Sequence, residues 1–445
     1  MLLPKIILSN EGRTLYNTKN HPIRTVKNMI EHFFKFENFD NLDYKITIKQ
    51  NFDKLLVPLS HPARNIKDTF YLNENYIKNF PFFFENYYIR LDILNKYYKY
   101  YLSNKLLDHD KVKLLRTHMT THLPYLLKEN YKNVIYTGTV YRKDEIDKYH
   151  FPIFHQTDGF LIRSESFEVE TDLKKKLENL INYLFKYKKI EMKWENNTSF
   201  PFTDPSYELY IKREKDNKWI EILGCGKIKK EVIYMSLYEK DINKIIENEI
   251  SLFDKNLFTN INNYSSNIFQ IPNKESFASI INKLCDKQLN NQITLKINEF
   301  LKNLNFQGWA FGIGLERLCM LLYDIQDIRL FWSNDKRFIN QFKENEITKF
   351  YPFSNFPPIE KDISFYINDN FKESIFFQLC RDIANENIEE VKKVDHYYNP
   401  KTNQTSVCYR ITYRSHNQNL THKFVNKIQN QIIQSLIKEC SVYVR

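Results

Sequence analysis

The sequence predicts an α+β protein with a long antiparallel hairpin and a C-terminal domain of order βαββαβ. Three stretches indicate this fold class. The segment 308–314 alternates bulky and small residues, as a strand with two unlike faces does, and then changes to helical spacing. The segments 134–142 and 153–163 have strand character and enclose a charged loop, which predicts the hairpin. From residue 351 on, strand and helix patterns follow each other in the βαββαβ order.

The composition fits a chain that buries large cores. It has 445 residues, 42% of them hydrophobic, with 30 Tyr and 35 Phe, which argues against wholesale disorder. The formal net charge of +11 favours a polyanionic partner, although many lysines lie in Asn/Lys-rich runs typical of solvated loops. The six cysteines are scattered without a C-x-x-C pair. This argues against a zinc site or a disulfide framework and favours a reducing compartment.

Targeting and membrane signals are weak. No apolar run reaches the roughly 18 residues that a membrane helix needs, so we expect no membrane partner. The N-terminus lacks the apolar core of a secretory signal. Residues 9–24 contain Ser and Arg together with Glu11, so a mitochondrial presequence here and one upstream of residue 1 both fit.

Residues 1–50 are predicted to be rich in helix, because residues 25–34 carry apolar side chains at helical spacing. Residues 74–111 and about 231–304 differ in composition, being rich in Tyr, Asn, Lys, Phe and Ile without a clean period. We interpret both stretches as insertions packed at the surface, the first with a helix near 88–102.

The predicted hairpin carries polar residues in alternate positions. Residues two apart share a face of a strand, so Val140, Arg142 and Asp144 are expected to lie together on the first strand. On the second strand the shared face holds Phe154, Gln156, Asp158 and Phe160.

Residues 308–317, GWAFGIGLER, contain three of the chain's 8 glycines. Bulky residues alternate here with Ala310, Gly312 and Gly314, so one face packs a core while the other lets a flat ligand lie against the backbone. Arg317 follows in the first turn of a helix, where the helix dipole does not favour a cation. A bound phosphate would remove that conflict. A core strand followed by a surface arginine is the alternative.

The C-terminal elements are predicted at 362–367 (strand), 372–384 (helix), 389–398 (strand), 407–414 (strand), from 421 (helix) and at 440–445 (strand). This order is the ferredoxin-like split βαβ arrangement. In the strand 407–414, Arg410 and Arg414 lie on one face, which suits RNA.

Taken together, these stretches resemble the class II aminoacyl-tRNA synthetases, and specifically the single-chain, mitochondrial-type phenylalanyl-tRNA synthetases. GWAFGIGLER, continuing into LCMLLYDIQDIRLFW, is similar to motif 3 of that family, and VYRKDEIDKYHFPIFHQ to motif 2. The arrangement NFDKLLVP, HPAR and YLN resembles motif 1. KTNQTSVCYRITYRSHNQNL resembles the family's C-terminal anticodon-binding domain.

The resemblance implies a catalytic domain over 1–340, built on the class II antiparallel β-sheet flanked by helices. It further implies a linker at 341–350 and a ferredoxin-like anticodon-binding domain at 351–445. The insertions at about 74–111 and 231–304 interrupt the first domain as surface padding, with tRNA contact as the alternative. The family also implies a monomer without a separate β subunit or an editing module. It implies the mitochondrial matrix, with another organelle or the cytoplasm as the alternative.

The implied reaction joins L-phenylalanine to ATP as phenylalanyl-adenylate and then transfers the acyl group to the 3′ end of tRNA(Phe). Attack on the α-phosphate builds negative charge, which fixed cations and Mg²⁺ stabilise. By the resemblance, Arg142 grips the α-phosphate and Arg317 clamps the ATP opposite it, a task that suits a planar, permanently charged guanidinium. These two arginines are the predicted catalytic residues. A surface cation is the alternative for Arg142.

The same resemblance completes the ATP site with Phe154, Gly312 and Gly314. His150, in the hairpin loop, would face the distal phosphates, and a loop histidine without a ligand is the alternative. Glu221 lies on an otherwise apolar strand, where a buried carboxylate needs a partner. Both Mg²⁺ bound with ATP and a structural ion pair meet that need.

FPFTDP resembles the family segment whose phenylalanines hold the substrate ring, so Phe200 and Phe202 are the predicted aromatic slot, with Ala310 as its floor. Residues two apart share a strand face, and two such phenylalanines in a core are the alternative. A slot without a polar group prefers phenylalanine because it leaves the tyrosine hydroxyl unpaired.

The amino-acid head group would be held by His118, Thr120, Gln156 and Asp158. Here the chain departs from the family pattern, roughly HTSxxQ. Thr120 keeps a hydroxyl where serine is usual, whereas Leu123 replaces the glutamine. Asp158 stands in place of a glutamate, so its carboxylate reaches about one bond less far.

Two other functions are compatible with part of this pattern. One is a catalytically inactive paralogue that binds tRNA, which the departures at Leu123 and Asp158 make conceivable. The other is a general RNA-binding protein, which would leave the glycine-rich strand without a purpose. The presence of both Arg142 and Arg317 favours the enzyme.

Overall fold

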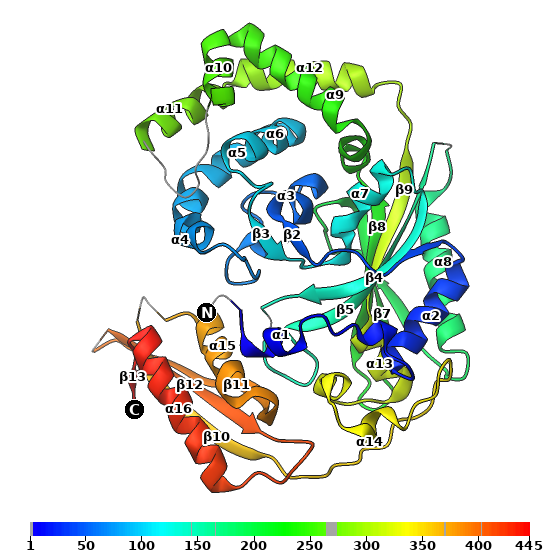
Figure 1. Cartoon of the computed structure of the whole chain (residues 1–445), viewed down its shortest axis with the longest axis vertical. Coiled ribbons are helices and arrows are strands. Elements are labelled where there is room, and N and C mark those ends of the chain that lie inside the picture. Colours follow the sequence, from blue (N-terminus) through cyan, green and yellow to red (C-terminus); the bar gives the residue numbers. More distant parts are fainter. Residues whose placement is uncertain (1–2, 144, 165, 264–273, 369–370, 402) are drawn as a thin grey trace. The chain divides into compact units, whose positions relative to one another are not determined.

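The computed structural model describes the chain except for residues 1–2, 144, 165, 264–273, 369–370 and 402 (Figure 1). The described residues pack into two compact units. Unit 1 combines Met1–Val26, Arg142–Phe154 and Glu316–Arg445, and unit 2 combines Lys27–Tyr141 and His155–Leu315. No helix among the described residues has the length and apolar character that crossing a membrane requires.

The central sheet has the strand order β1-β4-β5-β9-β8-β7-β6. Its strands are β1 (Glu37–Phe39), β4 (Asn133–Tyr141), β5 (Ile153–Arg163), β6 (Met192–Glu195), β7 (Thr203–Lys212), β8 (Trp219–Ile228) and β9 (Gln307–Gly314). Pairing from β5 through β9, β8 and β7 to β6 is antiparallel, whereas β1 runs parallel to β4. A small sheet pairs β2 (Lys45–Thr47) with β3 (Lys113–Leu115). The predicted hairpin strands and the predicted strand at 308–314 are confirmed.

Strand β9 shows the two unlike faces that its alternation predicts. On the bulky face, Trp309 and Phe311 are buried. The indole Nε1 of Trp309 donates a 2.7 Å hydrogen bond to Asp172 on α8 (Val169–Leu184). The apolar stripe of α8, which includes Leu173 and Leu177, is fully buried. Helix α8 therefore covers the bulky face of β9.

Helices form the rest of unit 2: α2 (Pro22–Phe34, in part), α3 (Ile48–Asn51), α4 (Glu74–Phe83), α5 (Ile89–Asp92), α6 (Lys96–Leu106), α7 (Leu123–Lys128), α9 (Lys230–Phe253), α10 (Lys255–Asn263), α11 (Lys274–Leu284) and α12 (Lys287–Leu301). Within the first insertion, the predicted helical stretch at 88–102 is confirmed for most of its residues, but it is divided into two helices. Helix α5 ends at Asp92 and α6 begins at Lys96, because Asn95 caps α6 by accepting a 3.0 Å hydrogen bond from the backbone of Tyr97.

Two insertion helices, α6 and α9, contact η2 (Asp53–Leu55) in the motif 1 segment. In that segment Asp53 forms a buried ion pair of 2.7 Å with Arg64 and a 2.8 Å hydrogen bond with His109. Although burial opposes it, the charges of His109 and Arg64 lower the pKa of Asp53 to about 2. Glu239 on α9 pairs with Lys54 at 3.4 Å. Side chains from the second insertion thus cover motif 1 within the same chain.

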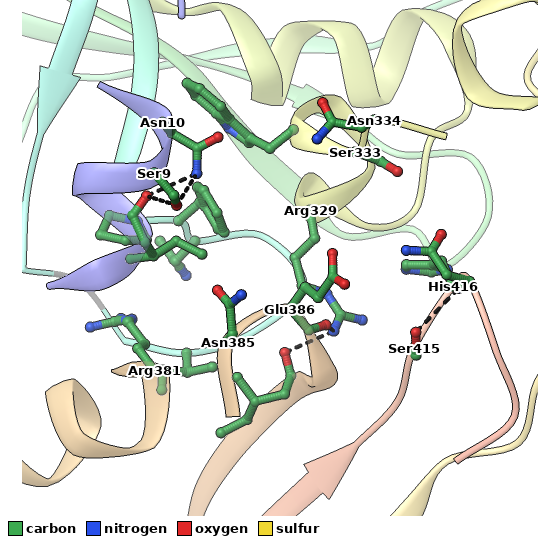
Figure 2. A pocket seen from close by; sticks show the side chains of 18 of the residues that line it. Ser9, Asn10, Arg329, Ser333, Asn334, Arg381, Asn385, Glu386, Ser415 and His416 are labelled. Carbon is green, nitrogen blue, oxygen red and sulfur yellow. Dashed lines mark hydrogen bonds between the residues drawn. The ribbon is translucent and has the colours of Figure 1, made fainter. Parts of the chain in front are cut away.

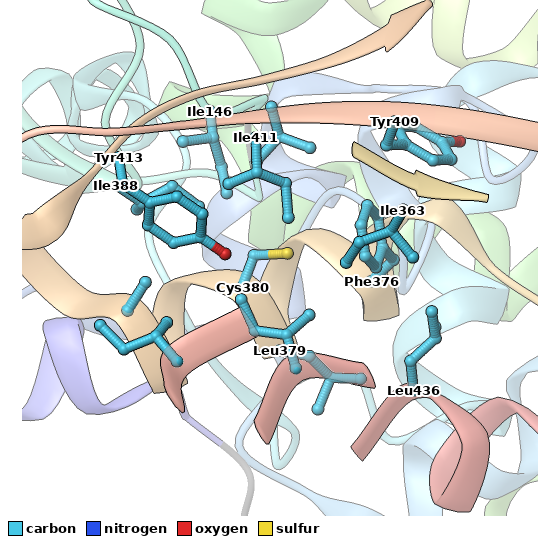
Figure 3. Close-up of a cluster of buried hydrophobic side chains, with 14 of the residues drawn as sticks. Ile146, Ile363, Phe376, Leu379, Cys380, Ile388, Tyr409, Ile411, Tyr413 and Leu436 are labelled. Atoms are coloured by element: carbon cyan, nitrogen blue, oxygen red, sulfur yellow. The ribbon is translucent and has the colours of Figure 1, made fainter. Parts of the chain in front are cut away.

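In unit 1 the C-terminal residues form the predicted βαββαβ domain, with sheet order β11-β12-β10-β13. Its elements are β10 (Ile359–Ile367), α15 (Glu373–Ala384), β11 (Ile388–Asn399), β12 (Gln404–Tyr413), α16 (His422–Cys440) and β13 (Tyr443–Val444). Alternate residues of β12 (Val407, Tyr409, Ile411 and Tyr413) are buried in its core (Figure 3). The other elements of unit 1 used below are α1 (Lys5–Asn10), α13 (Leu315–Tyr323), η6 (Ile328–Trp332, a 3-10 helix) and α14 (Lys336–Ile339).

Candidate active site

The residues predicted to hold the amino-acid head group come together in unit 2. The hydroxyl of Thr120 donates a hydrogen bond of 2.6 Å to Oδ2 of Asp158 on β5. One residue earlier, the backbone N–H of Met119 donates to Oε1 of Gln156 at 3.3 Å. Thr120 and Asp158 are 7% and 2% exposed. The short 3-10 helix η5 (Met119–His122) is thereby attached to the strand that carries both acceptors.

Glycine 312 makes room for this cluster. In the sheet, Gly312 lies opposite both Asp158 on β5 and Gly224 on β8. A Cβ added at Gly312 would lie 2.8 Å from Oδ1 of Asp158, closer than such atoms approach, whereas a Cβ at Gly314 would meet no atom within 4 Å. The glycine at 312 is thus required by a neighbouring side chain, and Gly314 borders open space.

The aromatic slot lies in a turn rather than on a strand. Phe200 and Phe202 precede β7, and their rings lie nearly parallel, 13° apart, with centroids 6.2 Å from each other. The predicted shared strand face is therefore wrong, because the chain has not yet entered β7 at these positions. Both rings are half-buried. The ring of His118 lies 5.9 Å from that of Phe202, which joins the aromatic pair to the head-group cluster.

The base of this region is tightly packed. Ala310 is 5% exposed and lies opposite Phe160 on β5 and Gly226 on β8. A Cβ added at Gly224 would lie 2.7 Å from Cζ of Phe200, so the position of that ring also depends on a glycine. Ala310 is thus buried in the sheet beside Gly226, at the position where the sequence predicts the floor of the aromatic slot.

Arg116 supports η5 and was not among the predicted site residues. It is 2% exposed, and its Nε donates to the backbone oxygen of Thr139 at 2.7 Å. Its Nη1 lies 2.9 Å from Nε2 of His122. Burial and the charge of Arg116 lower the pKa of His122 to about 3, so His122 is neutral and accepts this hydrogen bond. A Cβ at Gly138 would overlap the guanidinium. An isolated glycine inside a strand is the one local signal of this close approach.

Leu123, which replaces the family's glutamine, contributes no polar group. It begins α7 and is 1% exposed, in the core. The head-group cluster therefore consists of Thr120, Gln156 and Asp158, with His118 beside it.

In unit 1, the predicted phosphate-binding arginine lies one residue beyond β4. The backbone N–H of Arg142 donates to the oxygen of Pro152 at 3.1 Å and closes the loop between the hairpin strands. The guanidinium carbon of Arg142 lies 5.3 Å from the centroid of the Phe154 ring. This cation–π contact orients the charge and brings two predicted ATP-site residues together.

His150 lies in a turn organised by Asp147. One oxygen of that carboxylate accepts the backbone N–H groups of Tyr149 and His150 at 2.6 and 2.7 Å, and the other lies 2.8 Å from Nδ1 of His150. Burial raises the pKa of Asp147, but the hydrogen bonds from His150 and the backbone outweigh it and lower that pKa. Asp147 is a second residue that was not among the predicted site residues.

Arg317 is the third residue of α13 and is half-buried, which agrees with its predicted place in the first helical turn. Glu221 is half-buried on β8, opposite Tyr210, and not buried as its apolar surroundings predict. The strand register shifts between Leu209 and Tyr210, which moves the pairing of Glu221. Burial, a hydrogen bond to Glu208 and the charges of Glu208 and Glu221 raise the pKa of Tyr210 to about 12.

Glu221 is the carboxylate that the sequence assigns to Mg²⁺, an ion usually held by one or two carboxylates together with substrate phosphates. The nearby Glu208 already accepts hydrogen bonds from Thr198 and Tyr210. Within the described ranges, no group of three or more His, Cys, Asp or Glu side chains is arranged to hold a metal ion by itself.

Of the two arginines predicted to contact tRNA, one lies on the exposed face of the C-terminal sheet. Arg410 is 45% exposed and donates to both oxygens of Asp362 at 2.9 Å. Arg414 lies just beyond the end of β12, and its Nη1 approaches the buried carboxylate of Glu389 at 3.4 Å. Because β12 ends at Tyr413, only Arg410 of the two lies within the strand, and the shared face of the two arginines stays a prediction.

Comparisons with known proteins agree with this architecture. Residues 6–246 and 293–342 match the family described as tRNA synthetases class II core domain (F), and residues 354–445 match the ferredoxin-fold anticodon binding domain. The chain thus combines a class II aminoacyl-tRNA synthetase core with an anticodon-binding domain.

The full-length relatives are more specific. A phenylalanine–tRNA ligase, chloroplastic/mitochondrial, from Arabidopsis thaliana is 33% identical over 460 residues, which cover 100% of this chain and 82% of that protein. The mitochondrial phenylalanine–tRNA ligase of Saccharomyces cerevisiae is 30% identical, covering 99% and 91%. That of Dictyostelium discoideum is 28% identical, covering 100% and 89%. The chain belongs to this family of single-chain organellar phenylalanine–tRNA ligases. The predicted mitochondrial location agrees with the names of these relatives.

Proposed function

We propose that the protein is a phenylalanine–tRNA ligase that activates L-phenylalanine with ATP and Mg²⁺ and transfers it to the 3′ end of tRNA(Phe) in an organelle. The observation that carries this proposal is the junction of two unlike surfaces in unit 2. The polar cluster of Thr120, Gln156 and Asp158 suits an α-amino group, and the half-buried rings of Phe200 and Phe202 suit a benzyl side chain. His118 lies between the two surfaces.

The amino-acid side of the site explains the choice of substrate. An ammonium group placed near Asp158 and Gln156 gains charge-assisted hydrogen bonds. A benzyl ring packed against Phe200 and Phe202 exchanges its contact with water for contact with aromatic rings. The slot residues supply no polar group for a tyrosine hydroxyl, which would stay unpaired and make binding of tyrosine less favourable.

ATP is assigned to Arg142, His150, Phe154 and Arg317, with Gly312 and Gly314 as the bare backbone that a nucleotide approaches. In the first step a carboxylate oxygen of phenylalanine attacks the α-phosphorus, an acyl–phosphate bond forms and pyrophosphate leaves. The two guanidinium groups stabilise the charge that develops on the phosphate oxygens. Glu221 is the residue assigned to hold Mg²⁺ bound with ATP, which would supply further positive charge to the phosphates. No side chain of the protein becomes covalently modified.

In the second step a hydroxyl of the terminal ribose of tRNA attacks the acyl carbonyl, the ester forms and AMP leaves. We assign tRNA contact in the C-terminal domain to Arg410, and we retain Arg414 only as a supporting residue. A monomer is the proposed state, because the motif 1 residues Asp53 and Arg64 are already buried beneath helices of the same chain. The domain boundaries 1–340, 341–350 and 351–445 are part of the same proposal.

The deciding experiment is phenylalanine-dependent exchange of pyrophosphate into ATP, with tyrosine in place of phenylalanine as one control. The Arg317→Ala variant tests the assigned cation. Arg337→Ala is its matched control, because Arg337 is a half-exposed arginine on α14 that pairs with neighbouring Asp335 and lies over the ring of Phe353, away from the predicted site residues. We expect exchange with phenylalanine, little with tyrosine, loss in Arg317→Ala and no change in Arg337→Ala. A folded protein that binds tRNA(Phe) but shows no exchange, with or without tRNA, would be the inactive paralogue instead.

A further inference from the structure

The loop that follows Arg142 is anchored in the C-terminal domain. Ile146, in the middle of this loop, is 6% exposed and belongs to the hydrophobic core of that domain. Figure 3 shows it among Ile388, Ile411 and Tyr413, which come from the C-terminal sheet. An apolar side chain from the presumed ATP-binding loop thus completes a core that is otherwise built from residues more than 200 positions further along the chain.

Main-chain hydrogen bonds fix the same stretch. The backbone oxygen of Ile146 accepts from the N–H of Val391 on β11 at 3.0 Å. The preceding residue, Glu145, accepts at its backbone oxygen from Nη2 of Arg381 on α15 at 2.6 Å. Two consecutive loop carbonyls are therefore held by two different elements of the C-terminal domain.

Lys148 adds a third attachment. Its ammonium group lies 3.0 Å from Oε1 of Glu389, whose side chain is only 4% exposed. Its backbone oxygen accepts from the N–H of Ile328 at 2.9 Å. The side-chain contact reaches β11 and the main-chain contact reaches η6, so the loop is held from two directions.

Beside these attachments the loop borders an open cavity of about 270 Å³. Asp147, His150 and Phe151 line it on the loop side, and Asn385 and His416 line it on the side of the C-terminal domain (Figure 2). The side chain of His150 is 35% exposed and lies 2.8 Å from the carboxylate of Asp147 in the same loop, and Ile146 lines the cavity as well. The position of the loop depends on Ile146 and the hydrogen bonds beside it.

We propose that Ile146 is a positioning residue through which the anticodon-binding domain holds the ATP-binding loop in place for adenylate formation. The inference rests on the proposed function, because it takes Arg142 and His150 as ATP ligands. It goes further in one respect. Amino-acid activation, a step in which tRNA takes no part, requires contacts that the anticodon-binding domain makes.

The test measures pyrophosphate exchange without tRNA at varied ATP and varied phenylalanine. In Ile146→Ala the loop loses its anchor, and we expect the KM for ATP to rise about tenfold, since displacements near 1 Å cost that much or more. The KM for phenylalanine should stay unchanged. In Ile146→Val, which keeps most of the apolar side chain, the KM for ATP should stay close to the wild-type value. The matched control is Leu436→Ala on α16, a fully buried residue of the same core that is not part of the loop.

A second variant tests the same loop without removing a buried side chain, so it is less prone to misfold. Lys148→Met removes the ion pair to Glu389 from a side chain that is 43% exposed, and it should raise the KM for ATP in the same direction. An unchanged KM for ATP in folded Ile146→Ala and Lys148→Met would overturn the proposal. So would an equal rise in Leu436→Ala, because the effect would then be general loosening of the domain.

Loop position can also be read without catalysis. The ring of Phe151 stacks on Trp332 at 5.8 Å, so tryptophan fluorescence during ATP titration reports on the loop. Weaker ATP binding in Ile146→Ala than in Leu436→Ala would support the positioning role even if the wild-type chain showed no exchange. Failure of exchange in the wild type would overturn the proposed function alone.

Discussion

The hydroxyl of Thr120 donates a 2.6 Å hydrogen bond to the carboxylate of Asp158, and both side chains are buried. These are two of the positions at which the sequence departs from the synthetase pattern, with threonine for serine and aspartate for glutamate. Their direct contact joins the two departures in one interaction. Hydrogen bonds between a hydroxyl and a carboxylate are among the stronger ones in proteins. The hydroxyl of Thr120 therefore holds the carboxylate of Asp158 in one position, although the aspartate side chain is shorter than that of glutamate.

Thr120→Val removes the hydroxyl and keeps the shape of the side chain. Asp158 then loses a charge-assisted hydrogen bond, and we expect the KM for phenylalanine to rise about tenfold or more. The KM for ATP should not change. Steady-state pyrophosphate exchange at varied phenylalanine measures the effect. Thr120→Ser keeps the hydroxyl and is the control. Equal KM values for phenylalanine in Thr120→Val and Thr120→Ser would show that the contact plays no part in substrate binding.

Two of the three glycines of β9, Gly312 and Gly314, border the two halves of the proposed site. A methyl group at Gly312 lies 2.8 Å from Oδ1 of Asp158, whereas one at Gly314 enters open space. Gly312→Ala should therefore displace Asp158 and raise mainly the KM for phenylalanine. Gly314→Ala should raise mainly the KM for ATP, because only a bound nucleotide would meet the new methyl group. Exchange kinetics with each substrate varied in turn distinguish the two. The reverse pattern would contradict the assignment of the β9 surface.

Strand β9, the hairpin and the βαββαβ domain are predictable from the residues alone, because alternation and helical spacing are local signals. The contact between Thr120 and Asp158 is not, since it joins residues 38 positions apart. The Asp158–Gly312 approach likewise depends on the register between β5 and β9, which no local pattern specifies. For these contacts the family resemblance names the right residues but supplies no geometry.

Period-two reasoning fails where the chain turns. Phe200 and Phe202 lie side by side in a turn before β7, and β12 ends one residue before Arg414. Element boundaries are the least predictable feature of a sequence. The role of Ile146 is beyond local reasoning for another reason: a single apolar residue in a charged loop does not show which distant core it enters.

Arg410→Ala tests the exposed face of the C-terminal sheet. Removing the guanidinium takes away a cation and leaves Asp362 uncompensated, so tRNA(Phe) binding should weaken and the slope of log K against log salt should fall by about 1. Filter binding at several salt concentrations measures both, and pyrophosphate exchange should stay unchanged. Arg337→Ala, which breaks a similar forked pair with Asp335, is the control. Unaltered tRNA affinity in Arg410→Ala would remove this face from the proposed contact.

The buried pair of Arg116 and His122 predicts how stability depends on pH. His122 has a folded-state pKa of about 3 against an ordinary value of 6.5. The unfolded chain therefore binds a proton that the folded chain does not, so stability is fully present above pH 6.5 and falls as the pH is lowered. The expected slope is about 1.4 kcal/mol per pH unit. Asp53 has a folded pKa of about 2 against an ordinary value of 3.8. Its stabilising contribution is therefore fully present above pH 3.8, and it adds to the acid sensitivity only below that value.

His122→Gln isolates this contribution between pH 7 and pH 5. The glutamine oxygen can still accept from Arg116, but it does not titrate, so the variant should lose less stability than the wild type over that range. Urea unfolding followed by circular dichroism at both pH values gives the two transition midpoints for each protein. A parallel decline in both would assign the acid sensitivity to other groups. A smaller decline in the variant would show that neutral His122 supports the segment carrying Thr120, and that acidification weakens the amino-acid site by charging it.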